Sequence, residues 1–142
     1  MRDIKFRAWD ARNNEMVFSE ATDCFYINTK GVLFMYAIPK SESGLETVYH
    51  KSYDVDEFTG LKDCKGVDIY KGDVMMKVMV DHSVHRCVIR YSDKHAKFVF
   101  SPVMERWDFD IDVVANPYER QSYRVIGNVQ ENPELMERDN EK

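Results

Sequence analysis

The sequence predicts a mainly β protein, of the kind that folds as a small barrel or sandwich, and three observations support this fold class. Short segments rich in Val, Ile and aromatic residues follow one another, with turn residues at regular spacing between them. Three glycines and short apolar stretches alternate within the seventeen residues from Phe58 to Val74. Hydrophobic residues make up 44% and aromatic residues 13% of the chain, which is enough to fill a core.

Two tight turns in this glycine-containing stretch organise the rest of the chain. Asp63-Cys64-Lys65-Gly66 has Asp in the first turn position, where its carboxylate accepts backbone hydrogen bonds, and Gly in the last, where a positive φ costs nothing. Lys71-Gly72-Asp73 is the second turn, and a long β-rich run begins after it at Val74. Between the turns we expect one short strand, formed by Val67, Ile69 and Tyr70.

The N-terminal part predicts two hairpins. Ile4, Phe6 and Ala8 alternate with charged or amphipathic residues, residues 10–14 supply a turn, and residues 16–18 return as the partner strand. The second hairpin joins residues 25–27 to residues 32–36 through Asn28-Thr29-Lys30-Gly31. Residues 39–44 are predicted as a surface loop and residues 47–56 as an irregular strand.

The C-terminal part predicts a β meander with a closing strand. Strands are expected over residues 74–80, 84–91 and 97–101, with turns at 81–83 and 92–95, and residues 105–112 are expected as an edge strand or loop. Residues 123–129 form the closing strand, and a short helix starts at Asn132-Pro133-Glu134, since Asn caps helices and Pro fits their first position. The expected core residues are Phe6, Leu61, Ile69, Val78, Val88 and Ile126.

Length and charge limit the function classes. A chain of 142 residues makes one domain or two small ones. The net charge of -5 argues against non-specific coating of nucleic acid over the whole surface, although a local basic patch is compatible with it. We expect a cytoplasmic protein, because no stretch resembles a signal peptide or a membrane span. Three widely spaced cysteines predict reduced thiols.

Two clusters resemble metal sites only superficially. His82, His85, Cys87 and His95 match no strong zinc spacing, and we interpret them as turn histidines beside a buried thiol. Asp108, Asp110 and Asp112 lack the glycine of a calcium loop, so we interpret them as a solvated acidic edge. We therefore expect no metal and no cofactor.

The remaining chemistry points to binding rather than catalysis. The sequence has neither a G-x-S-x-G nucleophile motif nor a glycine-rich phosphate loop, so we expect no enzyme. Residues 77–97 carry a local charge of +3, which keeps a nucleic-acid hypothesis open. The candidate binding residues are Lys77, Arg86, Arg90, Lys94 and Lys97. The competing interpretation places these cations on ordinary strand exteriors and the neighbouring aromatic residues in the core.

Three ordered motifs make the chain resemble the YopX-like family of phage and prophage proteins. They are Ile4-Lys5-Phe6-Arg7-Ala8-Trp9-Asp10 at the start, residues 59–63 with Ile69-Tyr70-Lys71-Gly72-Asp73-Val74 in the middle, and residues 126–129 with Glu131-Asn132-Pro133-Glu134-Leu135 at the end. The resemblance covers nearly the whole chain. Cys64 and Val67 depart from it, since the family more often has polar residues there.

The resemblance implies a fold and a setting but no activity. The implied fold has a small SH3-like barrel in the C-terminal half of the chain. The β-rich N-terminal portion covers residues 1–57, the barrel covers residues 58–130, and a short helix and tail cover residues 131–142. The setting is a phage or prophage gene in a bacterial cytoplasm. The leading hypothesis is a non-enzymatic accessory protein that binds a protein partner; the alternative is nucleic-acid binding through the basic hairpin of residues 77–97. Self-association is left open.

Overall fold

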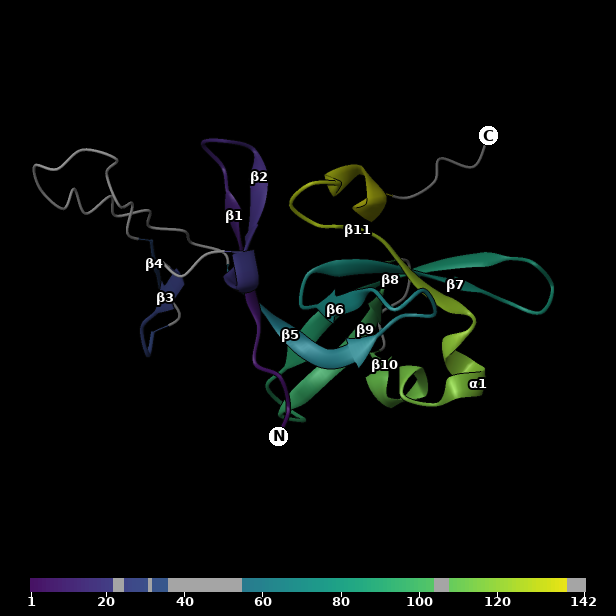
Figure 1. Ribbon diagram of the computed structural model, residues 1–142. Helices are drawn as coiled ribbons and strands as arrows, with labels where there is room; N and C mark the ends of the chain where they lie inside the picture. The colour runs from purple at the N-terminus through teal and green to yellow at the C-terminus, as the bar shows by residue number, and fades with distance from the viewer. Residues whose placement is uncertain (22–24, 31, 36–54, 104–107, 138–142) are drawn as a thin grey trace, which may run out of the picture. The chain divides into compact units, whose positions relative to one another are not determined.

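The computed structural model describes residues 1–21, 25–30, 32–35, 55–103 and 108–137. The chain divides into two compact units, one of residues 4–57 and a larger one of residues 1–3 and 58–142. Both are built mainly from β-strands, as the sequence predicts (Figure 1). The loop expected over residues 39–44 and most of the strand expected over residues 47–56 lie outside the described residues.

The smaller unit contains two antiparallel hairpins. β1 (Phe6–Asp10) pairs with β2 (Glu15–Phe18) on one side and with residues 55–57 of β5 (Val55–Lys62) on the other. The Arg7 Nε donates to the Asp56 carboxylate at 3.2 Å, which pairs two charges that are both nearly buried. β3 (Phe25–Ile27) pairs with β4 (Leu33–Met35). The turn between them is held by Asn28 Oδ1, which accepts from the backbone N–H groups of Lys30 and Val32.

The larger unit is organised around one five-stranded antiparallel sheet. Its strand order is β10-β9-β8-β7-β11, and the sheet is strongly curled (Figure 1). The strands are β7 (Asp73–Val78), β8 (Val84–Ser92), β9 (Lys97–Pro102), β10 (Phe109–Asp110) and β11 (Tyr123–Asn128). β6 (Asp68–Tyr70) pairs with residues 58–62 of β5. An edge strand or loop is predicted over residues 105–112. Within this range β10 is an edge strand of two residues, residues 111 and 112 belong to a 3-10 helix, and residues 105–107 lie outside the described residues.

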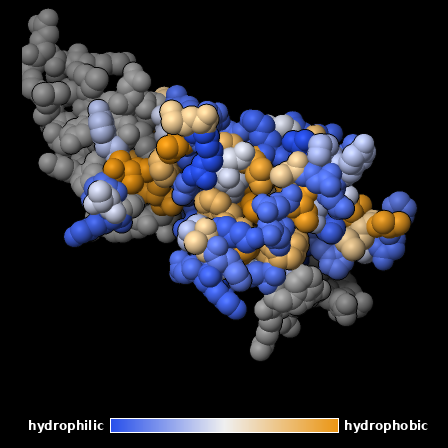
Figure 2. Space-filling model, turned by 90° about the horizontal axis from the view of Figure 1, so that it is seen from below, coloured by the Kyte–Doolittle hydropathy of each residue, from blue (hydrophilic) through white to orange (hydrophobic). Residues whose placement is uncertain are grey.

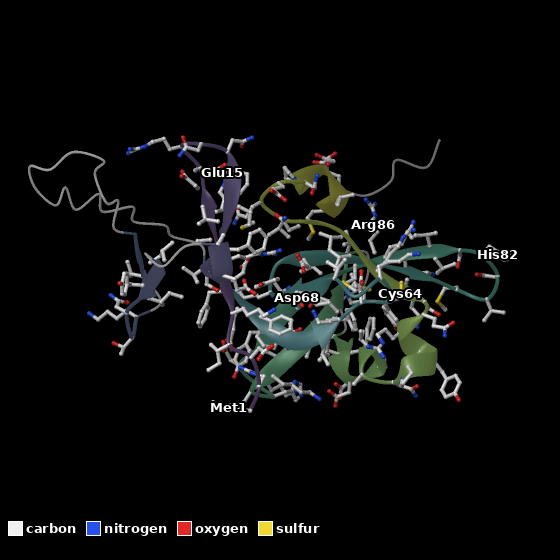
Figure 3. The ribbon with its side chains drawn as sticks, viewed as in Figure 1. Met1, Glu15, Cys64, Asp68, His82 and Arg86 are labelled. Atoms are coloured by element: carbon white, nitrogen blue, oxygen red, sulfur yellow. The ribbon has the colours of Figure 1, made fainter. Side chains whose placement is uncertain are left out.

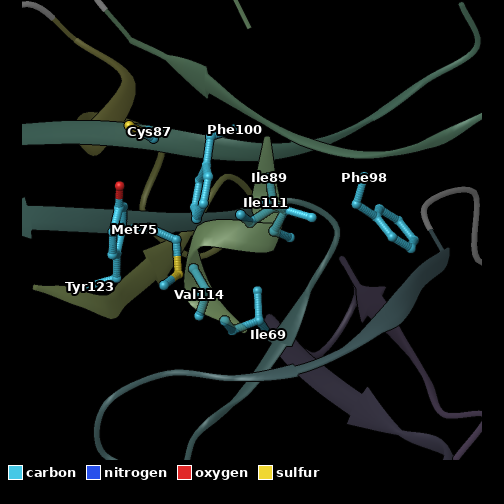
Figure 4. Packing of buried hydrophobic residues seen from close by; sticks show 9 residues of the cluster. All are labelled: Ile69, Met75, Cys87, Ile89, Phe98, Phe100, Ile111, Val114 and Tyr123. Carbon is cyan, nitrogen blue, oxygen red and sulfur yellow. The ribbon is translucent and has the colours of Figure 1, made fainter. Parts of the chain in front are cut away.

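One face of this sheet packs onto a closed apolar core. The cluster takes residues from β6, β7, β8, β9 and β11 and from the 3-10 helix η2 (Ile111–Val114) (Figure 4). Its members are Ile69, Met75, Cys87, Ile89, Phe98, Phe100, Ile111, Val114 and Tyr123. The Phe100 ring stacks on Tyr123 at 5.2 Å between centroids and on Phe109 at 5.1 Å. Aromatic ring contacts of this kind stabilise the core beyond the burial of the rings alone.

Both organising turns form as the sequence predicts. Gly66 has φ +81 and its N–H donates to the Asp63 carbonyl at 3.1 Å. Gly72 has φ +83, donates to the Ile89 carbonyl at 2.9 Å and accepts from the Val129 N–H at 3.0 Å. Only glycine adopts this left-handed backbone without steric cost, so the turn that precedes β7 requires a glycine at position 72.

The predicted core set is correct for some residues and wrong for one. Ile69 and Val88 are buried, and Leu61 packs half-buried against the cluster. Phe6 and Ile126 are only partly buried. Val78 is 39% exposed, because the β7–β8 hairpin runs past the end of the core.

Three further differences concern secondary structure. β5 is a continuous strand through Phe58–Lys62, where no strand is predicted, and it accommodates Gly60 at φ +89 within a register shift. The predicted C-terminal helix is instead the 3-10 turn η3 (Pro133–Met136), and its N-cap residue Asn132 makes no side-chain capping bond. The short helix α1 (Pro117–Arg120) and η2 are not predicted from the sequence.

Candidate interaction surface

The far end of the β7–β8 hairpin is an ordered turn with a polar apex. Met79 donates to the Ser83 carbonyl at 2.9 Å, and His82, at φ 65, donates to the Met79 carbonyl at 3.0 Å. The Asp81 carboxylate accepts from both the N–H and the hydroxyl of Ser83. These hydrogen bonds lower the pKa of Asp81 below its ordinary value. The hairpin therefore presents its side chains from a defined backbone.

Apolar side chains are exposed around this turn. Val80 is fully exposed, Val84 is 55% exposed, and Val78 and Met79 are exposed to 39% and 37%. Figure 2 shows hydrophobic side chains at the end of the molecule that carries this hairpin in Figure 1. We call Val78, Met79, Val80 and Val84 the hairpin-end patch.

The strand registers divide the five predicted basic residues among different positions. Arg86 and Arg90 alternate with the core residues Cys87 and Ile89, so they face away from the core. Lys97 is paired in register with Ser92 and shares that outer face. Lys77 lies on the opposite face, 5.1 Å from the centre of the Tyr123 ring, and Lys94 lies in the turn between β8 and β9. The five cations therefore do not form one surface.

Two of the outward-facing cations have partners within the chain. Arg86 Nη2 donates to the Glu137 carbonyl at 2.8 Å, next to the C-terminal turn (Figure 3). Lys97 forms an exposed ion pair with Asp110. The hydrogen bond from Lys97, together with one from the Asp112 N–H, lowers the pKa of Asp110. The hydrogen bond to Asp110 in turn raises the pKa of Lys97. Arg90 is exposed.

The structure adds an arginine that sequence reasoning missed. Arg124 of β11 is paired in register with Met76 of β7, and Met76 is paired with Arg86 of β8. The three side chains therefore form one row across the outer face, with Met76 between the two guanidinium groups. Arg124 Nη2 lies 3.9 Å from Met76 Sδ. Since Arg86 and Arg124 are 38 positions apart in the sequence, only the pairing of β7 with both neighbours brings them together.

The aromatic residues considered for base stacking are mostly in the core. Phe98 and Phe100 belong to the buried cluster, as the competing interpretation predicts. Tyr91 is 47% exposed and contacts Phe98 edge-on at 5.4 Å. Trp107 lies outside the described residues.

The histidines and acidic residues considered as metal ligands have separate surroundings. Cys87 is buried in the core, His85 is exposed, and His95 Nδ1 lies 3.0 Å from Ser92 Oγ. Asp110 caps η2 by accepting from the Asp112 N–H at 3.0 Å. Among the described residues, no group of three or more His, Cys, Asp or Glu side chains is arranged to hold a metal ion. In that same part of the chain, no helix has the length and apolarity needed to span a membrane.

Comparisons with known proteins identify the family. Among curated proteins, no sequence match was found. A solved structure, the crystal structure of protein EF1440 from Enterococcus faecalis, is similar with a TM-score of 0.60 and 28% sequence identity. The similarity covers 96% of this chain and 100% of that chain. The family model described as YopX protein matches residues 5–137, nearly the whole sequence, and the chain therefore belongs to the YopX family.

Proposed function

We propose that this YopX-family protein is a non-enzymatic phage or prophage accessory protein that binds a protein partner in the bacterial cytoplasm. Its larger unit, which we interpret as an SH3-like barrel, would present the binding surface. The phage setting rests on the family resemblance, and the binding role rests on the hairpin-end patch.

The exposure of the hairpin-end patch carries the proposal. Large apolar side chains that gather on one surface, rather than scatter singly, mark sites of protein interaction. All four patch residues come from one hairpin, and Val80 is fully exposed. The backbone bonds across the turn hold this hairpin in one conformation, so little conformational entropy is lost when a partner docks.

A capture experiment with a matched control tests the proposal. The full chain, immobilised and exposed to lysate of a bacterial host carrying the phage or prophage, should retain a specific protein. The double variant Val80→Ser, Val84→Ser should lose that protein, because both side chains lie in the hairpin-end patch. Val67→Ser is the control, since Val67 is 48% exposed but lies in the turn after Asp63. Equal retention by all three proteins would exclude the patch as the binding surface.

Nucleic-acid binding is a second candidate, supported by the shared outward face of Arg86, Arg90 and Lys97. If these residues contact phosphates, affinity should fall steeply with salt, because each neutralised phosphate releases condensed counterion. Arg86→Glu with Arg90→Glu should then abolish binding while the fold remains intact. A filter-binding titration at low salt that retains no DNA or RNA would end this candidate.

A further inference from the structure

We propose that Arg86 and Arg124 select an acidic amphipathic helix as the segment of the protein partner that docks beside the hairpin-end patch. This inference rests on the proposed function and names the chemistry of the partner. It starts from the row formed by Arg124, Met76 and Arg86 on the outer face of the sheet.

The row continues directly into the hairpin-end patch. Val78 and Val84 are paired in register two positions beyond Met76 and Arg86, so their side chains lie on the same face in the next row. Both valines are exposed, and Met76 is half-buried. The outer face thus presents an apolar strip of Met76, Val78 and Val84. Arg86 and Arg124 lie on either side of Met76.

The spacing of the two arginines fits a helix. Their backbones are separated by two inter-strand distances, or about 10 Å. Side chains seven residues apart on a helix lie on one face and are separated by about the same distance along the axis. Carboxylates at positions i and i+7 would therefore reach both guanidinium groups, with apolar residues at i+3 and i+4 over Met76 and the valine pair. An extended peptide fits less well, because same-face residues in a strand are separated by about 7 or 14 Å.

The charge of the surface favours carboxylates as ligands. Arg124 is exposed, and its Nη2 lies 3.9 Å from the thioether sulfur of Met76, a weak acceptor that leaves the guanidinium well suited to a carboxylate. Arg86 Nη2 donates to the backbone carbonyl of Glu137 at 2.8 Å, so an oxygen acceptor already lies at the Arg86 end of the row. The two arginines bracket Met76 with positive charge, which complements an acidic helix.

Two other occupants are disfavoured by neighbouring residues. A membrane would have to receive the hairpin apex first, and that apex is Asp81, His82 and Ser83, with an ionised carboxylate. A single-stranded nucleic acid would use stacking platforms, but Phe98 and Phe100 are in the core.

The test is a titration of the ¹⁵N-labelled full chain with a synthetic peptide. The peptide is an amphipathic helix with Glu at positions i and i+7 and Leu at i+3 and i+4. Chemical-shift changes should concentrate at Met76, Val78, Val84, Arg86 and Arg124. Affinity should fall at about 0.5 M salt, where exposed charges are strongly screened. Arg124→Glu should weaken binding about tenfold or more, and Arg124→Lys should retain most of it.

Arg90→Glu is the matched control for charge. Arg90 lies on the same face and is exposed, but its register partner is Val99, away from the row of Met76, so this variant should bind the peptide as the wild type does. A peptide with Lys in place of both Glu residues should cause no shifts at the row. Unchanged binding in Arg124→Glu, or equal binding of the Lys peptide, would overturn the inference.

Parallel titrations separate the remaining outcomes. Chemical-shift changes produced by oligo-dT but not by the acidic peptide would assign the outer face to nucleic acid. If the protein sediments with anionic vesicles and does not bind the peptide, the outer face would be assigned to lipid. Either result overturns the inference. If the peptide fails to bind but the double variant Val80→Ser, Val84→Ser still abolishes capture from lysate, the inference of an acidic helix fails and the proposed function stands. If capture is insensitive to those substitutions, the proposed function itself fails.

Discussion

The carboxylate of Asp63 accepts a hydrogen bond from the backbone N–H of Val125 at 3.0 Å, across 62 positions of sequence. Its other oxygen accepts from the N–H groups of Lys65 and Val67, so the same side chain closes its own turn and fixes β11 beside it. The neighbouring Cys64 N–H donates to the Tyr123 carbonyl at 3.3 Å. The first organising turn is thus a structural anchor for the closing strand.

We predict that Asp63→Ala destabilises the protein by at least about 3 kcal/mol. The substitution removes three hydrogen bonds to a charged acceptor, each worth roughly 1.5 to 3 kcal/mol, from a side chain that is buried. Urea denaturation measures the loss. Asp93→Ala, in an exposed turn, should change stability by no more than about 0.5 kcal/mol; equal effects of the two variants would contradict the anchoring role.

The two positive-φ turn glycines should differ in their sensitivity to substitution. Gly66 has open space where a Cβ would stand, so Gly66→Ala should cost only the left-handed backbone strain of about 1 kcal/mol. Gly72 is buried and bonded to both Ile89 and Val129, so Gly72→Val should add a steric term and cost more than Gly66→Ala. Thermal unfolding of both variants provides the comparison, and a smaller loss for Gly72→Val would refute this explanation.

Gly127→Ala should detach the C-terminal turn. A Cβ at this position would stand 2.4 Å from Asn132 Oδ1 and 2.8 Å from Leu135 Cδ1, closer than non-bonded atoms allow. Amide hydrogen exchange should therefore accelerate at Asn132 and Leu135, whose N–H groups are bonded within this segment. Leu135→Ala in the Gly127→Ala background should restore part of the protection. Unchanged exchange in Gly127→Ala would show that η3 adjusts without displacement.

Ile69→Ala should cost roughly 2 to 5 kcal/mol, the range for truncating a fully buried aliphatic side chain. Ile69 is 0% exposed and belongs to the cluster around Phe100 and Tyr123. Val67→Ala, two positions away and 48% exposed, is the control and should have little effect. A loss for Ile69→Ala within the error of a denaturation curve would mean that the core closes without it.

The ion pair of Lys97 and Asp110 gives stability an acid-side pH dependence. Because the folded state lowers the pKa of Asp110, the pair stabilises the protein above the unfolded carboxyl pKa of about 3.9, and this contribution is lost as pH falls through the folded value. The raised pKa of Lys97 places the corresponding loss at strongly alkaline pH. Asp110→Asn should therefore weaken the pH dependence of the unfolding midpoint below about pH 4. Identical profiles for variant and wild type would show that the exposed pair is too well solvated to matter.

Local sequence signals predicted elements whose geometry is set within a few residues. The Asp63 and Gly72 turns, the hairpins and the strands from residue 73 to residue 102 follow from turn chemistry and from the alternation of apolar residues. The same signals failed where an element depends on distant contacts. Residues 55–57 of β5 pair with β1 and residues 58–62 pair with β6, so the strand continues despite Gly60. A helix start is predicted at Asn132-Pro133-Glu134. The segment instead packs against Gly127 and forms only a 3-10 turn.

Alternation of apolar and polar residues was enough to predict the β class and the outward direction of Arg86 and Arg90, because alternation along one strand needs no knowledge of its neighbours. The ordered motifs were enough to predict the family. Which charges share a surface depends instead on how the strands pair, and no single strand contains that information. Lys77 lies over Tyr123 on the inner face, whereas Arg124 joins Arg86 on the outer face because β7 pairs with both β8 and β11. Val78 has the alternation of a core residue yet lies exposed, because its hairpin extends beyond the elements that could cover it. Burial depends on what packs against a side chain, and a sequence pattern specifies only the direction in which that side chain points.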